Sequence, residues 1–257
     1  MSKTFKAPGI LNPTSGFCAG CGHGIINRIL AETLEEMEVE KKTIIALAVG
    51  CSCIMSTYFQ VDKILGPHGR SPAVATGIKR LRPENVVLTY QGDGDISSIG
   101  TAEIIHAAAR NEKITTIFVN NGVYGMTGGQ MAPTTLPNQK TATSPFGKDT
   151  SLAGMPIKLS EMLAVLPVAY IARGSVHNIA EINKTKKYIR EALEKQLNGD
   201  GFAMVEILSP CPTNWHLSPV ASMKHIAEET VKYYPLGVMA DNVMVDGEMV
   251  KKEDVCS

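Results

Sequence analysis

The sequence predicts an α/β fold, with a parallel sheet covered by helices on both faces. Two observations carry this prediction. Strand-length apolar segments alternate with helix-length amphipathic segments, and the strands are apolar along their whole length rather than at every second position. The chain has 257 residues, of which 44% are hydrophobic, so it is long enough to bury one large core.

The elements follow from the spacing of apolar residues. Residues 24–38 carry apolar side chains at helical intervals, and the short apolar run at 43–50 that follows stops at a glycine. The same alternation predicts further strands at 85–90, 114–120, near 168–172 and at 202–208, and helices at 96–111 and 179–197.

A single domain is expected over residues 1–234. Within it, residues 127–156 are rich in Thr, Pro and Gly without a sustained period, which predicts a long functional loop or partner-binding segment; a disordered insertion is the alternative. Residues 235–257 are expected to form a C-terminal extension lying on a neighbouring subunit.

Composition excludes several classes of function. Lys plus Arg and Asp plus Glu both number 25, so no basic excess favours nucleic acid or an anionic membrane. No apolar run approaches the roughly 20 residues needed to cross a bilayer, and the N-terminus lacks the pattern of a signal peptide. We therefore expect a cytoplasmic protein whose six cysteines are thiols.

Polar side chains follow two successive predicted strands. Asp93 follows the strand at 85–90 and Asn121 follows the strand at 114–120, with one helix between them. A right-handed crossover brings both to the carboxyl edge of the sheet, where Mg²⁺ between side-chain oxygens and a phosphate is the expected ligand. Gly94 and the amides that open the following helix are free to face the phosphate.

Two alternatives to this metal site stay open. Gly-Asp-Gly and Asn-Asn-Gly are also common turn formers, so each motif alone is more often only a turn. A phosphotransferase with Asp93 and Asp95 as its acidic pair is the other alternative, although no matching Lys follows a later strand.

Cysteines gather at three predicted loops. Cys18 and Cys21 form CAGCGHG, Cys51 and Cys53 form GCSC after a strand, and Cys211 lies in SPCPT, while Cys256 is next to the last residue. Four of these thiols would suffice for an iron–sulphur cluster or a structural zinc ion. Independent buried thiols are the third interpretation.

The spacing GDG, twenty-five residues, NN resembles the thiamine diphosphate motif. In that motif the Asp, the second Asn and a main-chain carbonyl two residues later hold Mg²⁺ on the diphosphate. The resemblance implies that Asp93, Asn121 and the carbonyl of Val123 are the ligands.

A longer series of motifs resembles the thiamine-binding β subunit of the 2-oxoacid:ferredoxin oxidoreductases. It runs through CAGCGHG, GCS, HGRSPAVATGIK, GDGDISSIG, NNGVYGMTGGQMAPTT and SPCPT, roughly residues 15–216. The resemblance implies a [4Fe–4S] cluster on Cys18, Cys21, Cys51 and Cys211. It also implies a coenzyme site formed by Gly50, Cys51, Ser52, His68, Gly94, Asp95, Asn121 and Gly125.

Two residues near these motifs have a less definite place. His23 is expected to be a structural neighbour of the cysteine loop, and Cys53 departs from the usual family pattern, in which that position is not a cysteine. We expect Cys51, rather than Cys53, to ligate the cluster.

The resemblance also implies an activity. Such subunits take part in the oxidative decarboxylation of a 2-oxoacid to acyl-CoA and CO₂, with electrons passing through the cluster to ferredoxin. The motifs look most like relatives acting on branched-chain 2-oxoacids, such as 2-oxoisovalerate, or on 2-oxoglutarate. A non-catalytic metal-binding scaffold of the same fold is the alternative.

A partner is implied because thiamine activation normally requires a Glu that faces the aminopyrimidine from a second domain. We expect an α subunit to supply this Glu. A γ subunit and a ferredoxin-like subunit can belong to the same complex. Only if this chain acted alone would Glu103, Glu161 or Glu206 be candidates.

Overall fold

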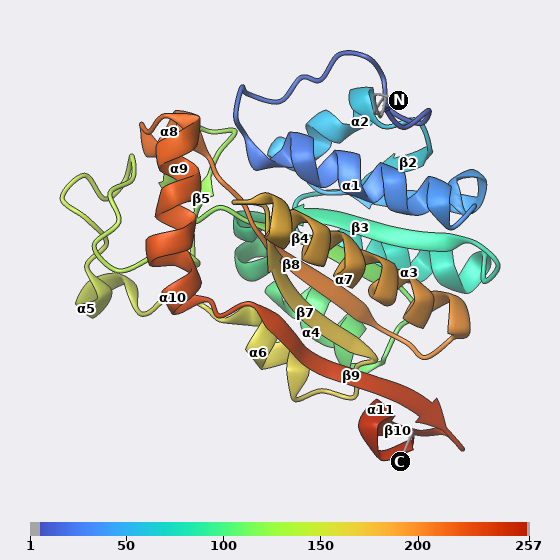
Figure 1. Cartoon of the computed structure of the whole chain (residues 1–257). Helices are drawn as coiled ribbons and strands as arrows, with labels where there is room; N and C mark the ends of the chain where they lie inside the picture. The colour runs from blue at the N-terminus through green and yellow to red at the C-terminus, as the bar shows by residue number, and fades with distance from the viewer. Residues whose placement is uncertain (1–5, 256–257) are drawn as a thin grey trace.

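The computed structural model describes residues 6–255 and is built around one eight-stranded sheet (Figure 1). The strand order is β10-β9-β7-β8-β4-β3-β1-β2. The strands from β7 to β2 in this order run parallel, β9 is antiparallel to β7, and β10 is antiparallel to β9. The predicted fold class is therefore confirmed.

The strands of this sheet are β1 (Thr43–Leu47), β2 (Asp62–Leu65), β3 (Val86–Gly92), β4 (Thr115–Asn120), β7 (Tyr170–Ser175), β8 (Ala203–Leu208), β9 (Gly237–Val245) and β10 (Glu248–Lys251). The longer helices are α1 (Gly22–Glu36), α3 (Ser71–Leu81), α4 (Thr101–Ala109), α6 (Leu159–Ala164), α7 (Ile179–Asn198) and α9 (Pro219–His225). Short helices are α2 (Met55–Tyr58), α5 (Thr150–Ala153), α8 (Pro212–Trp215), α10 (Val231–Tyr233) and α11 (Lys252–Val255).

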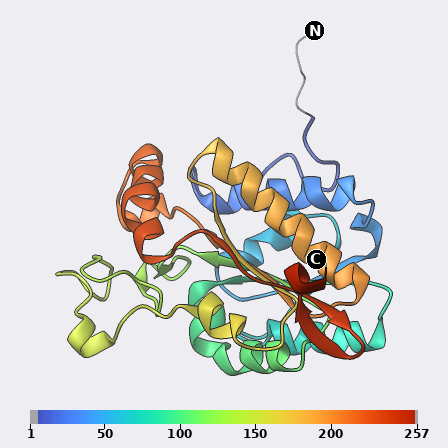
Figure 2. The ribbon, with the colours of Figure 1, turned by 60° about the horizontal axis from the view of Figure 1, so that its bottom comes forward.

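Helices cover both faces of the sheet, with α1 and α7 on one face and α3, α4 and α6 on the other (Figure 2). Successive strand residues point to opposite faces. Leu88 therefore packs with Leu30 and Ile189 in one core, and its neighbour Val87 packs with Ile104 in the other. Burial on both faces explains why the strands are apolar throughout.

Two predicted elements are shorter than expected because of glycines. The helix predicted over 96–111 is interrupted at Gly100, which separates a single π-helical turn, Asp95–Ile99, from α4. A Cβ on Gly100 would lie 2.4 Å from the carbonyl oxygen of Gly69, so only glycine permits this approach. The strand predicted over 43–50 ends at Leu47, before the turn that contains Gly50.

The segment 127–156 is irregular over most of its length but is folded. It contains β6 (Gln130–Met131), which pairs with β5 (Val123–Tyr124), and the short helix α5. The backbone N–H of Asn138 donates to the carbonyl of Lys148, and the N–H of Lys148 donates to the carbonyl of Gln139, so the two ends of residues 138–148 are held together. It extends from the sheet at the left of Figure 1.

The sheet continues past the domain boundary that the sequence predicts at residue 234. We expected an extension from Pro235, but residues 237–245 form β9, which pairs with β7 of the same chain. Asn242 fixes this strand, because its side-chain amide donates to the carbonyl of Val168 at 2.7 Å and its backbone N–H donates to Ala169 at 2.8 Å. Cys256 lies outside the described residues.

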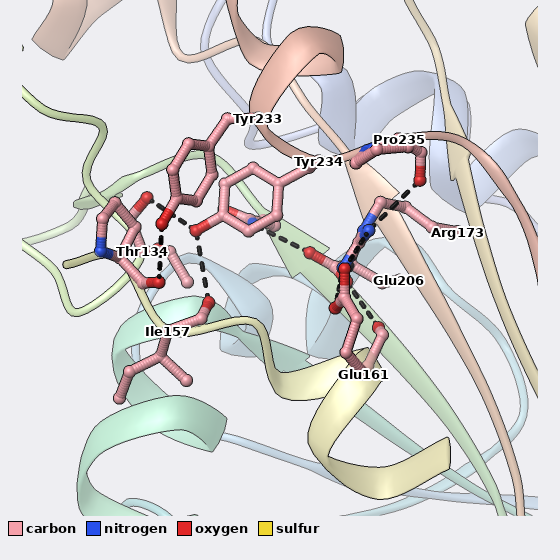
Figure 3. Close-up of polar contacts among 11 residues, drawn as sticks. Thr134, Ile157, Glu161, Arg173, Glu206, Tyr233, Tyr234 and Pro235 are labelled. Atoms are coloured by element: carbon pink, nitrogen blue, oxygen red, sulfur yellow. Dashed lines mark hydrogen bonds and ion pairs between the residues drawn. The ribbon is translucent and has the colours of Figure 1, made fainter. Parts of the chain in front are cut away.

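A buried ionic network joins this C-terminal segment to the sheet (Figure 3). Arg173 of β7 is fully buried, and its guanidinium donates to Glu206 of β8 at 2.7 Å and to Glu161 of α6 at 2.6 Å. It also donates to the carbonyl of Pro235 at 3.1 Å, and Glu206 accepts from Asn120 at 2.7 Å. One cation thus connects two strands, a helix and the start of the C-terminal segment.

We predict that Arg173→Met lowers the free energy of unfolding by about 3–5 kcal/mol, because Glu206 would remain as a buried and unpaired charge. Denaturant unfolding of the purified protein measures the change. The control is Arg28→Met, which removes a surface pair with Glu32 and should cost less than about 1 kcal/mol. Equal losses in the two variants would contradict the importance of the network.

Candidate active site

A cavity opens at the carboxyl edge of the sheet, beyond the ends of β1, β3 and β4. Ligands of open α/β sheets bind at this edge. The lining includes Asp93 and Val123 and every residue for which a coenzyme contact is predicted: Gly50, Cys51, Ser52, His68, Gly94, Asp95, Asn121 and Gly125. Four separate loops therefore contribute to one site: those that follow β1, β2, β3 and β4.

Asp93 holds two of these loops together. Its Oδ2 accepts from the backbone N–H of Asn121 at 3.2 Å and of Gly122 at 2.5 Å, and from the hydroxyl of Thr134 at 2.7 Å. Its Oδ1 accepts only from the N–H of Gly94, at 2.9 Å. Burial raises the pKa of Asp93 to about 6 although these donors lower it, and no Lys or Arg within residues 6–255 forms an ion pair with it.

Asp95 organises a second part of the wall. Its carboxylate contacts the Nδ1 atom of His68, accepts from the N–H of Gly69 at 2.7 Å and accepts from the side-chain amide of Gln91 at 2.6 Å. Asp95 is 2% exposed, whereas the His68 side chain is 31% exposed. His68 is thus oriented by a buried carboxylate and presents its ring at the cavity.

These contacts argue against the phosphotransferase alternative. A nucleophilic carboxylate needs an oxygen that can approach phosphorus. Asp93 keeps one such oxygen, Oδ1, but both oxygens of Asp95 are held, Oδ1 by His68 and Gly69 and Oδ2 by Gln91, so Asp95 cannot serve as the second acid of the pair.

A tight turn at the end of β1 presents Cys51 and Ser52 to the cavity. Gly50 has φ 103°, in the region that strongly favours glycine, and its carbonyl accepts from the N–H of Cys53 at 3.0 Å. This turn directs Cys51 to the cavity, while Cys53 is not among the lining residues.

The loop with Cys18 and Cys21 packs directly against the loop before Cys211. The N–H of Gly22 donates to the carbonyl of Pro210 at 3.2 Å, and a Cβ on Gly22 would lie 2.2 Å from the hydroxyl oxygen of Ser209. Only glycine allows this approach. Sequence segments almost two hundred residues apart are thereby brought into contact.

Cys51 and Cys211 both approach Gly125. A Cβ placed on Gly125 would lie 3.2 Å from the Sγ of Cys51 and 3.7 Å from the Sγ of Cys211. Both sulphur atoms therefore border the Asn121–Gly125 loop. In the described residues, no group of three or more His, Cys, Asp or Glu side chains is spaced to hold a single metal ion.

The thiols resist ionisation in this arrangement. Burial, followed by repulsion from the neighbouring thiolates, raises the pKa of Cys51 to about 12. Burial raises the pKa of Cys21 to about 11, although a hydrogen bond from the backbone of His23 lowers it, and burial also raises the pKa of Cys211. A metal centre bound by these thiols would displace their protons.

His23 lines the cavity, which the sequence did not predict beyond its place next to the cysteine loop. Its Nδ1 lies 2.6 Å from the hydroxyl of Tyr90, which also accepts from Asn27 at 3.0 Å, and its ring stacks on Phe17. Burial lowers the pKa of His23 to about 4, so its ring is neutral. Only the position of His23 in the CAGCGHG motif, at the start of α1, could have indicated this place.

None of the three glutamates considered from the sequence lines the cavity. Glu103 pairs with Arg70, and Glu161 and Glu206 are bound to Arg173. The carboxylates that line the cavity, among described residues, are Asp93 and Asp95.

Comparisons with known proteins decide the family. Residues 48–207 match the thiamine pyrophosphate enzyme C-terminal TPP binding domain. The 2-oxoglutarate synthase subunit KorB of Archaeoglobus fulgidus is 34% identical over 212 residues, which are 82% of this chain and 75% of that protein. The chain belongs to the thiamine-binding β subunits of the 2-oxoacid:ferredoxin oxidoreductases.

Two further comparisons extend this result. Ketoisovalerate oxidoreductase subunit VorA of Methanothermobacter marburgensis is 41% identical over 255 residues, 98% of this chain, but the chain spans only 53% of that protein. A solved 2-oxoglutarate:ferredoxin oxidoreductase from Magnetococcus marinus superposes with a TM-score of 0.73 and 25% identity, covering 95% of this chain and 90% of that chain. The predicted family is confirmed.

We predict that Asp93→Asn abolishes Mg²⁺-dependent binding of thiamine diphosphate while the fold is retained, because the amide keeps the shape of the side chain but loses its charge. Calorimetry with Mg²⁺ and thiamine diphosphate measures binding. Asp62→Asn, at an exposed position of β2, is the matched control and should bind as the parent does. Unchanged affinity in the Asp93 variant would exclude it as the metal ligand.

We further predict that Cys51→Ser loses or perturbs an iron–sulphur cluster whereas Cys53→Ser retains it, since only Cys51 lines the cavity and borders Gly125. Iron content and EPR spectra of anaerobically purified variants give the result. The reverse pattern would identify Cys53 as the ligand. If neither variant changed the cluster, neither cysteine of this turn would be a ligand.

Proposed function

We propose that this chain is the catalytic thiamine-diphosphate subunit of a complex that oxidatively decarboxylates a 2-oxoacid to acyl-CoA and CO₂, and passes the electrons to ferredoxin. One observation carries the proposal. Asp93, Asn121 and Val123 line a single cavity together with the Gly50–Ser52 turn, and the cysteine loops pack beside it. A binding scaffold without catalysis would not require the predicted metal and diphosphate ligands to lie together at one cavity.

Mg²⁺ fits the residues at this site. Asp93 is a buried carboxylate without a cationic partner in the described structure, and its Oδ1 accepts one hydrogen bond only, so an oxygen lone pair is free. Burying an uncompensated charge is costly, and a divalent cation would offset that cost. Asn121 and the carbonyl of Val123 would complete the protein ligands, and the diphosphate would supply others.

Thiamine diphosphate, when bound, supplies the carbanion chemistry that breaks the bond to CO₂. The protein's part is to bind and orient it. Asp95 holds His68 at the cavity, and the turn at Gly50 keeps Ser52 buried in the wall. The Asn121–Gly125 loop closes the site from the other side.

A [4Fe–4S] cluster fits the cysteines, because the loop with Cys18 and Cys21 packs on the loop before Cys211, and the sulphur atoms of Cys51 and Cys211 both border Gly125. Gly125 ends the Asn121–Gly125 segment, which we call the coenzyme loop. We propose Cys18, Cys21, Cys51 and Cys211 as its ligands. Such a cluster accepts one electron at a time, which suits transfer to ferredoxin.

A partner subunit is part of the proposal. None of the described residues that line the cavity is a Glu, and the VorA relative is about twice the length that this chain covers. Exposed apolar side chains on the 127–156 segment also favour a protein contact: Phe146 is 96% exposed, Leu152 88% and Met155 61%. We propose an α subunit that contributes the activating Glu, with γ and ferredoxin-like subunits in the same complex.

A branched-chain 2-oxoacid is the substrate that we favour. Val49 and Met126 are partly exposed apolar residues at the cavity, and no Lys or Arg among the described residues lines it to bind a second carboxylate. The VorA relative, named for ketoisovalerate, is 41% identical, compared with 34% for the KorB relative. 2-Oxoglutarate is the second candidate.

We predict that the anaerobically purified complex oxidises 2-oxoisovalerate with coenzyme A and a low-potential acceptor at least tenfold more efficiently than 2-oxoglutarate, because an apolar wall does not compensate a second carboxylate. The isolated chain should be inactive. Activity of this chain alone would contradict the need for a partner subunit. A preference for 2-oxoglutarate would make that acid the substrate. A complex that contains no cofactor would favour the non-catalytic scaffold.

A further inference from the structure

The short helix α8 lies between the proposed cluster and the coenzyme loop. Cys211 immediately precedes it, and its last two residues reach across to the segment that follows β4. Trp215 donates from its indole Nε1 to the carbonyl of Asn121 at 3.0 Å, and Asn214 donates from Nδ2 to the carbonyl of Gly125 at 2.9 Å. Both ends of the Asn121–Gly125 loop are thus bound to one helical turn.

Asn214 makes a second contact, with a proposed cluster ligand. The same Nδ2 atom lies 3.4 Å from the Sγ of Cys211, so the two N–H bonds of one amide are directed at an oxygen and a sulphur. Because both neighbours are acceptors, the nitrogen rather than the oxygen of the amide must face them. The backbone N–H of Asn214 also donates to Cys211.

The position of Asn214 is tightly fixed. A Cβ on Gly129 would lie 2.9 Å from the Cβ of Asn214, and Gly129 is itself bound to Tyr124 by a backbone hydrogen bond of 2.9 Å. The side chain is therefore packed against the coenzyme loop while its amide points to sulphur. Few alternative rotamers remain for it.

We propose that Asn214 is a positioning residue that raises the reduction potential of the cluster by donating a hydrogen bond to the sulphur of Cys211, and that holds this sulphur in register with the coenzyme loop. The inference rests on the proposed function, since it requires the cluster. A donor to a thiolate ligand stabilises the more negative, reduced state of a cluster, and so favours its reduction.

Two variants isolate this bond. Asn214→Ala removes the side-chain donor but leaves the backbone N–H donor to Cys211, so the cluster should still assemble. Asn214→Asp keeps the volume of the side chain, removes the donor and adds a negative charge. We expect the midpoint potential to become more negative in the Ala variant and more negative still in the Asp variant.

The control is Trp215→Phe in the same helix. It removes the donor to Asn121 but none to Cys211, so we expect weaker binding of thiamine diphosphate with Mg²⁺ and an unchanged midpoint potential. If the substitutions only loosened α8, both the coenzyme affinity and the midpoint potential would change in every variant.

The measurement is an EPR-monitored redox titration of the anaerobic complex, in which dithionite adds one electron to each [4Fe–4S]²⁺ core to give [4Fe–4S]⁺. Calorimetry gives coenzyme affinity in parallel. A parent complex without a cluster would refute the proposed function rather than this inference alone. A parent with a cluster and Asn214 variants at the parent potential would overturn the inference. Loss of iron from both variants would also overturn it, because Asn214 would then only hold the loop.

Discussion

The site depends on one carboxylate, that of Asp93. Its two oxygens accept from Gly94, Asn121, Gly122 and Thr134, so the ends of β3 and β4 and the start of the long loop meet at a single side chain. Three of these donors are backbone N–H groups, which are strong and fixed in direction. These donors favour the charged carboxylate, but burial outweighs them and raises the pKa of Asp93 to about 6. Within residues 6–255 no Lys or Arg pairs with it, and a bound metal ion would supply the missing positive charge.

The Asp93 cluster is continuous with the ionic network of Arg173. Tyr234 donates to the carbonyl of Thr134, and the guanidinium of Arg173 lies over the Tyr234 ring (Figure 3). The hydroxyl of Thr134 in turn donates to Asp93. On the other side, Glu206 holds Asn120, the neighbour of Asn121. The Asn121–Gly125 loop is therefore linked to the buried ion pairs of Arg173 through Tyr234 and Thr134 on one side and through Asn120 on the other. This link explains why the chain keeps a fully buried ion pair, which is seldom stabilising by itself.

Sequence patterns predicted what depends on local composition and simple topology. The core strands were found because burial on both faces makes them continuously apolar, and Asp93 and Asn121 meet because a crossover places both at one edge. The break at Gly100 was missed because it depends on an approach to Gly69, thirty-one positions earlier in the sequence. β9 was missed because most of its residues are only partly buried and its burial pattern shows no clear alternation. The ligand sets themselves stay predictions.

Close contacts at glycines place the cysteine loops beside the proposed coenzyme site. Gly22 lets the first cysteine loop pack on Ser209, and Gly125 lets the sulphur atoms of Cys51 and Cys211 border the coenzyme loop. Burial raises the pKa of Cys51, and repulsion from the neighbouring thiolates raises it further. A cluster removes that repulsion because its irons share the thiolate charge. The packing of the protein itself holds the cysteine loops next to the cavity, so a cluster bound there would lie beside the proposed coenzyme site.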